Sequence, residues 1–183
     1  VTLESGRYRW QVALLGPAGL PLAPPTDLGK VDVQAPERLW QVPSVQHPMS
    51  VDLDGKVFCR GYDLEPAEGH PGDALHLTLY WQAQEVMDDD YHVFVHLVAL
   101  DGRILAQRDG VPVHWTRPTT GWAPGEVLVD PYELLIPADA PPGEYTLLAG
   151  MYDPTTNQRL PVRDASGQVV GDHILLGTVQ ISR

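Results

Sequence analysis

The feature that most constrains the fold of this chain is the alternation of apolar and polar residues over short stretches. In one stretch the apolar residues stand at every second position: Leu75, Leu77, Leu79 and Trp81. Successive side chains of a β-strand point to opposite faces, so this spacing places all of them on one side of a strand. Few stretches repeat apolar residues at helical spacing for three turns, so the chain is expected to be almost entirely β.

The next stretch has the same pattern, and its apolar face is formed by Tyr91, Val93, Val95 and Leu97. We expect both faces to lie in the core. Further strands are expected at Val57 to Leu64, Ile104 to Arg108, Val127 to Ile136, Tyr145 to Tyr152 and Ile174 to Ile181. The connections are rich in turn-forming residues, and the chain holds 18 Pro and 17 Gly. This pattern predicts an all-β fold, an antiparallel β-sandwich of the immunoglobulin-like or jelly-roll-like kind.

An internal repeat defines the predicted domain organisation. The segment Gly6-Arg7-Tyr8 matches Gly143-Glu144-Tyr145, and the later segment LGKVDV matches LGTVQI. Residues 1–34 are therefore interpreted as the closing strands of a preceding copy, residues 35–50 as a linker and residues 51–183 as one complete sandwich. The alternative is that the likeness reflects a generic Gly-x-Tyr corner of β-sandwich proteins. Because a lone hairpin is marginal in water, the first strands are expected to pack on the sandwich or on another molecule, including a second copy in a homodimer.

Charge and hydropathy argue against two kinds of partner. The formal net charge is -12, from 24 acidic and 12 basic residues, so no nucleic-acid partner is expected. No apolar run approaches the roughly 18 residues of a membrane-spanning helix, so this fragment is not expected to span a membrane. Cys59 is the only cysteine, and its place in a predicted strand favours a buried core residue over a reactive thiol.

Four segments carry a resemblance to a known family: LTLYWQAQ, DDDYHVFVHLVALDGRILAQRDGVP, PTTGWAPGEVLVDPYELLIP and PPGEYTLLAGMYDPTTNQRLPV. Across residues 56–181 the chain resembles the extracytoplasmic β-sandwich region of large bacterial membrane glycosyltransferases of the dolichyl-phosphate-mannose mannosyltransferase type, as found in Chloroflexi-like bacteria. The resemblance implies a location on the extracytoplasmic side of a membrane-anchored parent protein. It implies no catalytic residue in this chain, because the acidic motifs that transfer sugar in such proteins lie in membrane-proximal loops that this sequence lacks.

A candidate ligand site lies on the polar face of the two central strands. If residues 83–90 form a hairpin, Tyr80 on the first strand lies near Phe94 on the second, and His96 lies near Thr78. By analogy with carbohydrate-binding sandwiches, such a face of aromatic and polar side chains would hold a glycan. The alternative is that loops or the first strands cover this face.

The longest irregular stretch, from Asp109 to Glu126, adds two candidate residues. Long loops without secondary structure are often functional, and Trp115 with Arg117 would make a sugar platform. Packing of the loop itself is the alternative for Trp115. Trp122 precedes Ala-Pro-Gly and is expected to anchor the loop to the core.

No metal, cofactor or catalytic site is expected. His76, His92 and His96 could in principle supply three imidazoles to zinc, but His92 and His96 stand roughly 13 Å apart along a strand at about 3.3 Å per residue, too far to share one ion without another register. The run Asp88, Asp89 and Asp90 lacks the spacing and the glycine of a calcium loop. No nucleophile elbow, phosphate loop or zinc-protease motif is present, and a hydrolase with two carboxylates ranks last among the interpretations.

The sequence thus favours a non-catalytic accessory module of a membrane glycosyltransferase-like protein. Its candidate glycan-binding residues are Tyr80, Phe94, Trp115, Arg117 and His96. The rival interpretation is a structural spacer or assembly module with no small-molecule ligand, which contacts neighbouring copies through sheet edges. A binding module should expose aromatic rings in a groove, whereas a spacer should bury them.

Overall fold

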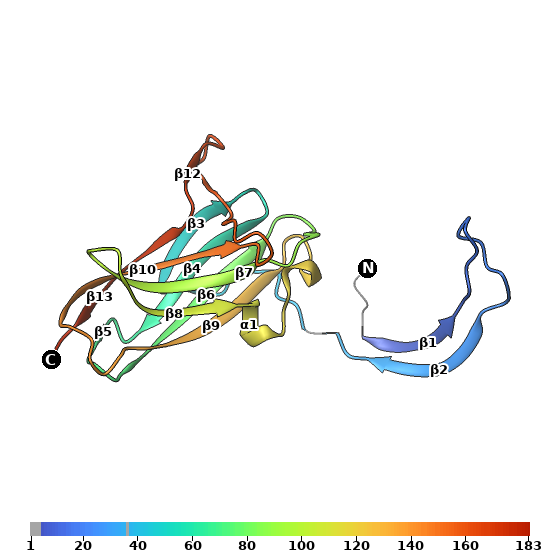
Figure 1. The fold of residues 1–183 in the computed structure, drawn as a ribbon, viewed down its shortest axis with the longest axis horizontal. Coiled ribbons are helices and arrows are strands. Elements are labelled where there is room, and N and C mark those ends of the chain that lie inside the picture. The colour runs from blue at the N-terminus through green and yellow to red at the C-terminus, as the bar shows by residue number, and fades with distance from the viewer. Residues whose placement is uncertain (1–4, 36) are drawn as a thin grey trace. The chain divides into compact units, whose positions relative to one another are not determined.

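The computed structural model describes residues 5–35 and 37–183, and nearly all of its regular secondary structure is β-strand (Figure 1). The chain divides into two compact units, Val1–Glu37 and Arg38–Arg183. The second unit contains two packed sheets whose strands are antiparallel, apart from one short parallel pair. The predicted all-β antiparallel sandwich is confirmed. Among the described residues, no helix has the length and apolar character needed to cross a membrane.

One layer of the sandwich is a five-stranded sheet in the order β5-β13-β10-β7-β8. Its strands are β5 (Glu68–Gly69), β7 (His92–Ala99), β8 (Ile104–Gly110), β10 (Gly143–Tyr152) and β13 (Ile174–Ile181). In the pairing of β10 with β7, Gly150 lies opposite Phe94 and Tyr152 lies opposite His92. This register brings the outward-facing residues of β7 and β10 next to each other.

The other layer is a six-stranded sheet in the order β12-β11-β3-β4-β6-β9. Its strands are β3 (His47–Leu53), β4 (Val57–Glu65), β6 (Ala74–Ala83), β9 (Val127–Leu135), β11 (Val162–Arg163) and β12 (Val169–Gly171). Two short elements, α1 (Pro112–Trp115) and the 3-10 turn η1 (Thr119–Gly121), lie in the connection from β8 to β9. This connection therefore runs from an edge strand of one sheet to an edge strand of the other.

The structure corrects the predicted pairing of the two central strands. β6 pairs with β4 and β9, whereas β7 pairs with β10 and β8, so the two do not form a hairpin. Residues 84–91 cross from one sheet to the other, and Met87 and Tyr91 in this connection are buried. Both strands carry a fully apolar face, and these faces meet across the core instead of lying side by side. The polar faces of β6 and β7 consequently lie on opposite sides of the sandwich.

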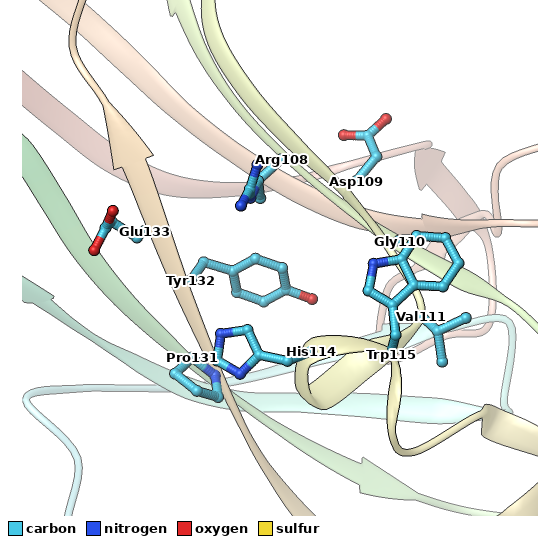
Figure 2. A pocket seen from close by; sticks show the side chains of 9 residues that line it. All are labelled: Arg108, Asp109, Gly110, Val111, His114, Trp115, Pro131, Tyr132 and Glu133. Atoms are coloured by element: carbon cyan, nitrogen blue, oxygen red, sulfur yellow. The ribbon is translucent and has the colours of Figure 1, made fainter.

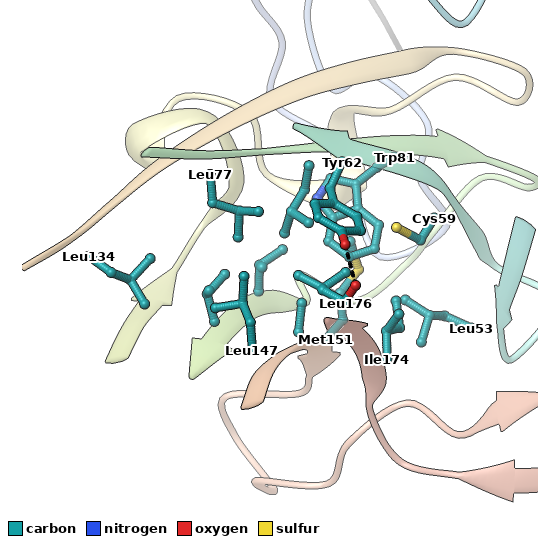
Figure 3. Close-up of a cluster of buried hydrophobic side chains, with 14 of the residues drawn as sticks. Leu53, Cys59, Tyr62, Leu77, Trp81, Leu134, Leu147, Met151, Ile174 and Leu176 are labelled. Atoms are coloured by element: carbon teal, nitrogen blue, oxygen red, sulfur yellow. Dashed lines mark hydrogen bonds between the residues drawn. The ribbon is translucent and has the colours of Figure 1, made fainter. Parts of the chain in front are cut away.

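The core between the sheets contains the alternating residues that the sequence singles out (Figure 3). All eight residues of the two predicted apolar faces are buried, and none is more than 6% exposed. Tyr62 of β4 crosses the core, and its hydroxyl donates a hydrogen bond to the carbonyl oxygen of Leu176 in β13. Burial raises the pKa of the Cys59 thiol to about 12, so Cys59 is an unreactive core residue, as predicted.

Residues 38–46 cover part of the outer face of the six-stranded sheet. Leu39 forms an isolated bridge with Val127 of β9, and the backbone N–H of Gln46 donates to Asp63 Oδ1 of β4 at 2.6 Å. β6 lies between β4 and β9, so this segment crosses it. Tyr80, on the outer face of β6, is only 7% exposed. Residues that the sequence places in a linker thus contribute this cover and the first part of β3.

The first unit is an antiparallel hairpin of β1 (Gly6–Val12) and β2 (Thr26–Val33). Its ladder has one register shift, between Trp10 and Gln11. An ion pair between Arg7 and Asp32 links the strands, but both side chains are about two-thirds exposed, so the pair contributes little stability. A two-stranded hairpin has no second layer of its own and cannot bury an apolar face by itself.

Candidate functional site

Trp115 is held in an unusual backbone conformation. Within α1, Val113 and His114 have φ values of 53° and 51°, and Trp115 follows with a φ of 67°. Three consecutive residues are therefore left-handed although none is glycine. Each such residue costs about 1–2 kcal/mol, because its Cβ approaches the following carbonyl oxygen. The surrounding structure must stabilise this turn.

Asp130 fixes the start of the turn. Its buried carboxylate accepts a hydrogen bond from the backbone N–H of Val113 at 2.7 Å. It also accepts from Trp81 Nε1 at 2.9 Å and from the hydroxyl of Tyr132 at 2.6 Å. Burial raises the pKa of Asp130, and the three hydrogen bonds oppose that shift by favouring the ionised form. The turn is thus tied to β6 and β9 of the six-stranded sheet.

Gly110 at the end of β8 makes room for the indole of Trp115. A Cβ at Gly110 would lie 2.8 Å from Cζ2 and 2.9 Å from Cε2 of the ring, which is closer than real contacts allow. The indole therefore lies directly against the backbone of Gly110. The residue as a whole is nevertheless 67% exposed. Trp115 is held in place on one side and open to solvent on the other.

A hollow of about 250 Å³ lies beside Trp115, at the edge where β8 and β9 meet (Figure 2). Its polar lining includes Arg108, Asp109, His114, Tyr132 and Glu133. A second hollow of about 160 Å³ lies on the outer face of the five-stranded sheet and is lined by Phe94, His96, Asp109, Tyr152, Asn157 and Arg159. Asp109 lines both hollows, so they are neighbours.

His92 connects the aromatic rings of this region. Its ring lies edge-on to Trp115 at a centroid distance of 5.3 Å and edge-on to Tyr152 at 5.7 Å. We define the Trp115 surface as His92, Asp109, Trp115, Tyr152 and Arg159. These residues come from β7, β8, α1 and β10 and from the loop after β10.

Phe94 supports this surface but does not present its own ring. It is 2% exposed and packs on Gly150, where a Cβ would lie 2.5 Å from Cζ of the ring. The guanidinium of Arg159 lies over the Phe94 ring, 4.3 Å from its centroid. The predicted stacking of a sugar on Phe94 is therefore blocked by Arg159, and Phe94 holds that cation through a cation–π contact.

His96 pairs with Asp109 below the same surface. Its Nε2 lies 3.2 Å from Asp109 Oδ1, and the residue is 8% exposed. Burial lowers the pKa of His96, Asp109 opposes this shift, and Arg159 adds to it. His96 thus lines the second hollow and helps to orient Asp109.

The side chain of Arg117 lines neither hollow, contrary to its predicted role in a platform with Trp115. Its guanidinium forms an ion pair with Glu126, whose side chain is fully buried, and Arg38 pairs with the same carboxylate. The carbonyl oxygen of Arg117 also accepts a hydrogen bond from Trp122 Nε1 at 3.0 Å. Trp122 is 2% exposed and anchors the loop to the core, as predicted. Arg117 is a structural residue because a buried carboxylate requires a cation.

Tyr80 is also separated from the other candidates. Its hydroxyl donates to Asp63 Oδ2 at 2.6 Å, and it lies on the outer face of the opposite sheet from Phe94 and His96. His76 lies on β6 as well, so it cannot share an ion with His92 and His96. In the part of the chain that the structure describes, no three His, Cys, Asp or Glu residues are grouped to hold a metal.

The sequence assigned no role to Asp109, Gly110, Tyr152 or Arg159. Asp109 and Gly110 stand at the start of the irregular stretch that contains Trp115. The sequence could therefore have predicted that they lie near Trp115. Tyr152 and Arg159 are recognisable only once β10 is known to lie beside β7. No pattern in the sequence supplies that pairing.

The sequence matches no protein-family model and no curated protein. Among solved structures, the C-terminal domain of Wzt is similar, with a TM-score of 0.51 and 16% sequence identity over 70% of this chain and 75% of that one. A CARDB domain of the PF1109 protein from Pyrococcus furiosus matches with a TM-score of 0.39 and 12% identity, over 76% of this chain and 95% of that one. At these identities the likeness concerns the fold alone. The second unit of the chain is therefore a β-sandwich similar in fold to the C-terminal domain of Wzt.

Proposed function

We propose that this chain is a non-catalytic accessory module that binds a glycan at the Trp115 surface. The observation that carries the proposal is the exposed indole of Trp115, which a strained left-handed turn holds against Gly110. Strained backbone of this kind is concentrated at active sites and ligand-binding sites. A large exposed aromatic ring in a fixed position offers an apolar face to the C–H side of a sugar ring and loses little entropy on binding.

The polar groups around Trp115 suit a ligand rich in hydroxyls. Asp109 can accept hydrogen bonds, Arg159 can donate them, and both line the second hollow. Glu133 and Arg108 offer the same pair of functions in the first hollow. Because the two hollows meet at Asp109, they fit a glycan of more than one sugar unit. Small-ligand sites typically combine an aromatic lining with a small number of polar groups that fix the orientation of the ligand.

We further propose that the module belongs to a membrane glycosyltransferase-like parent and works on its extracytoplasmic side. The support for this part is the sequence resemblance across residues 56–181. Any sugar transfer would then be the task of the parent, and this module would hold or orient the glycan.

The test is a titration with a panel of soluble glycans, followed by NMR of the five tryptophan indole N–H signals. Trp115 is expected to shift in a saturable manner, whereas the buried Trp81 and Trp122 should stay unchanged. Trp115→Ala is expected to lower the affinity at least tenfold, because it removes the platform. Trp40→Ala is the matched control, since Trp40 is 57% exposed but lines neither hollow.

Two results would contradict the proposal. One is the absence of any indole shift with millimolar glycan, which would favour a structural spacer. The other is an equal loss of affinity in Trp115→Ala and Trp40→Ala, which would place binding elsewhere. Appearance of new reducing ends in the same spectra would show a hydrolase instead of a binding module.

A structural spacer or assembly module is the second candidate function. The observation that favours it is the β1–β2 hairpin, whose apolar side chains are exposed: Trp10, Val12, Leu28 and Val31. Exposed apolar surface of this kind marks a site of association. The two functions are compatible, because the hairpin and the Trp115 surface lie in different units.

A further inference from the structure

The β1–β2 hairpin reproduces the pairing of β10 with β13. Both ladders run through five paired positions before the register shifts. The equivalent pairs are Gly6↔Val33 and Gly143↔Ile181, Arg7↔Asp32 and Glu144↔Gln180, Tyr8↔Val31 and Tyr145↔Val179, Arg9↔Lys30 and Thr146↔Thr178, and Trp10↔Gly29 and Leu147↔Gly177. The repeat seen in the sequence is therefore a repeat of strand register.

The irregularity of the two ladders is also the same. The register shifts directly after Trp10 in one hairpin and directly after Leu147 in the other. The residue opposite is a glycine with positive φ in both, Gly29 at 116° and Gly177 at 159°. A bulge changes the twist of a strand pair and is specific to its place in a fold. Because the register and the position of the bulge agree, the two hairpins place equivalent residues opposite each other along the whole ladder.

The two hairpins differ in what they bury. In β10 and β13, Leu147, Leu176 and Val179 face the core, and none is more than 5% exposed. Their equivalents on the first hairpin are Trp10, Leu28 and Val31, which are 61%, 60% and 37% exposed. The first hairpin thus has the apolar pattern of a hairpin that faces a core, but its apolar side chains are exposed. Because an isolated hairpin is marginal in water, this face requires a partner.

The second unit shows what such a hairpin packs against. There β10 pairs with β7, β13 pairs with the short β5, and the inner face of the hairpin lies on the six-stranded sheet. β10 and β13 close the sandwich as its last long strands. The first hairpin stands directly before β3, the first strand of this sandwich, which is the place of the closing hairpin of a sandwich before it.

We propose that β1 and β2 are the closing hairpin of a second β-sandwich, formed by residues that precede them in the same polypeptide. That sandwich presents two free strand edges, equivalent to those of β7 and β5, and an apolar inner face. The parent protein is then a tandem array of these modules. This inference is independent of glycan binding at the Trp115 surface.

The test compares the 183-residue chain with a longer polypeptide that includes about 100 natively preceding residues, the length of a sandwich domain. Amide hydrogen exchange is measured in the ladders of both hairpins. In the shorter chain, the β1–β2 amides are expected to exchange at nearly the rate of unfolded chain. In the longer one they should exchange at least about 100-fold more slowly, because they join a cooperative core. The β10–β13 amides should be protected in both and serve as the internal reference.

A pair of variants separates docking through the apolar face from simple chain extension. Trp10→Asp places a charge where Leu147 is buried in the equivalent hairpin, so it should abolish the protection of β1 and β2 in the longer polypeptide. Lys30→Asp changes the charge on the opposite face of the hairpin, at the position equivalent to the exposed Thr178. This variant should leave the protection of the β1 and β2 amides unchanged.

Four outcomes would overturn the proposal. Protection of β1–β2 in the shorter chain as a monomer would mean that the hairpin packs on its own sandwich. Protection that rises with concentration, together with a dimer in sedimentation, would identify a second copy as the partner. Absence of protection in the longer polypeptide would exclude a preceding sandwich, as would a native polypeptide that lacks enough preceding residues to form one.

Discussion

At the scale of the residue, Glu126 shows how one buried charge organises a loop. Its carboxylate is fully buried, pairs with Arg38 and Arg117, and accepts a hydrogen bond from the backbone N–H of Ala123 at 2.9 Å. An ionised carboxylate in the interior is tolerated only when such partners compensate for its lost hydration. Arg117 and Glu126 belong to the connection before β9 and Arg38 to residues 38–46, so the two pairs tie this connection to residues 38–46. Arg117 is therefore assigned to the support of this loop.

Replacing Arg117 tests this assignment. Arg117→Met leaves the buried Glu126 with one cation, and we expect the free energy of unfolding to fall by about 3 kcal/mol. Urea denaturation measures this change. Arg103→Met is the matched control, because the pair of Arg103 with Asp101 is about two-thirds exposed on both sides and contributes little. The folded Arg117→Met protein should bind glycan with the same affinity as the unsubstituted protein. A tenfold loss of affinity would show that Arg117 contributes to glycan binding.

At the scale of the element, the connection from β8 to β9 combines strain with support. Its left-handed residues place Trp115 on Gly110, and Asp130 holds the start of the turn. The turn is supported at two points, by the hydrogen bond from Val113 to the buried Asp130 and by the contact of Trp115 with Gly110. A platform that is fixed before binding gives up less freedom when the ligand arrives.

The contact between Gly110 and Trp115 can be tested by adding one methyl group. Gly110→Ala is expected to displace the indole, lower glycan affinity and change the chemical shift of the Trp115 indole N–H. It should also cost about 1–3 kcal/mol in stability, from overpacking and from the positive φ of 155°. Gly102→Ala is the control, because Gly102 also has a positive φ, of 83°, but no atom lies within 4 Å of its added Cβ. Equal effects of the two changes on the Trp115 signal would refute the contact.

At the scale of the whole molecule, a hydrogen bond joins the two sheets across an apolar core. The register shift between β10 and β13 leaves Leu176 outside the regular pairing, and its carbonyl oxygen accepts the hydroxyl of Tyr62 from the opposite sheet. Tyr62 is 6% exposed, so no water can replace this bond without opening the core. The link thus gives this carbonyl at the bulge a hydrogen-bond partner from the opposite sheet.

Removing this link should weaken the whole sandwich. Tyr62→Phe keeps the ring but removes the buried hydrogen bond to the Leu176 carbonyl, and we expect a loss of about 1–3 kcal/mol in the free energy of unfolding. The loss should appear in a single cooperative transition of the second unit, observed by urea denaturation. Tyr152→Phe, at a half-buried ring on the outer face, is the control and should change the transition much less. A Tyr62→Phe protein as stable as its parent would show that the bond contributes nothing net.

The sequence by itself determined the class of the fold and the inner side of each long strand. Alternation identified the buried faces of β6 and β7, the position of Cys59 marked it as a core residue, and Trp122 was recognised as an anchor. These features depend on near neighbours in the chain, because the period of a strand fixes which side chains share a face. The internal repeat likewise needed only a comparison of two segments.

Only the tertiary structure decided which strands lie beside one another. The alternation of apolar and polar residues shows on which face of a strand a residue lies, but not which strand is its neighbour in the sheet. The pattern was therefore equally compatible with β6 and β7 side by side in one sheet and face to face in two sheets. In the structure Tyr80 lies on the opposite sheet from Phe94 and His96, Arg117 pairs with Glu126, and Tyr152 and Arg159 join Phe94 and Asp109 at the second hollow. Sites are assembled from contacts between distant segments, and the energies of those contacts are absent from any local pattern.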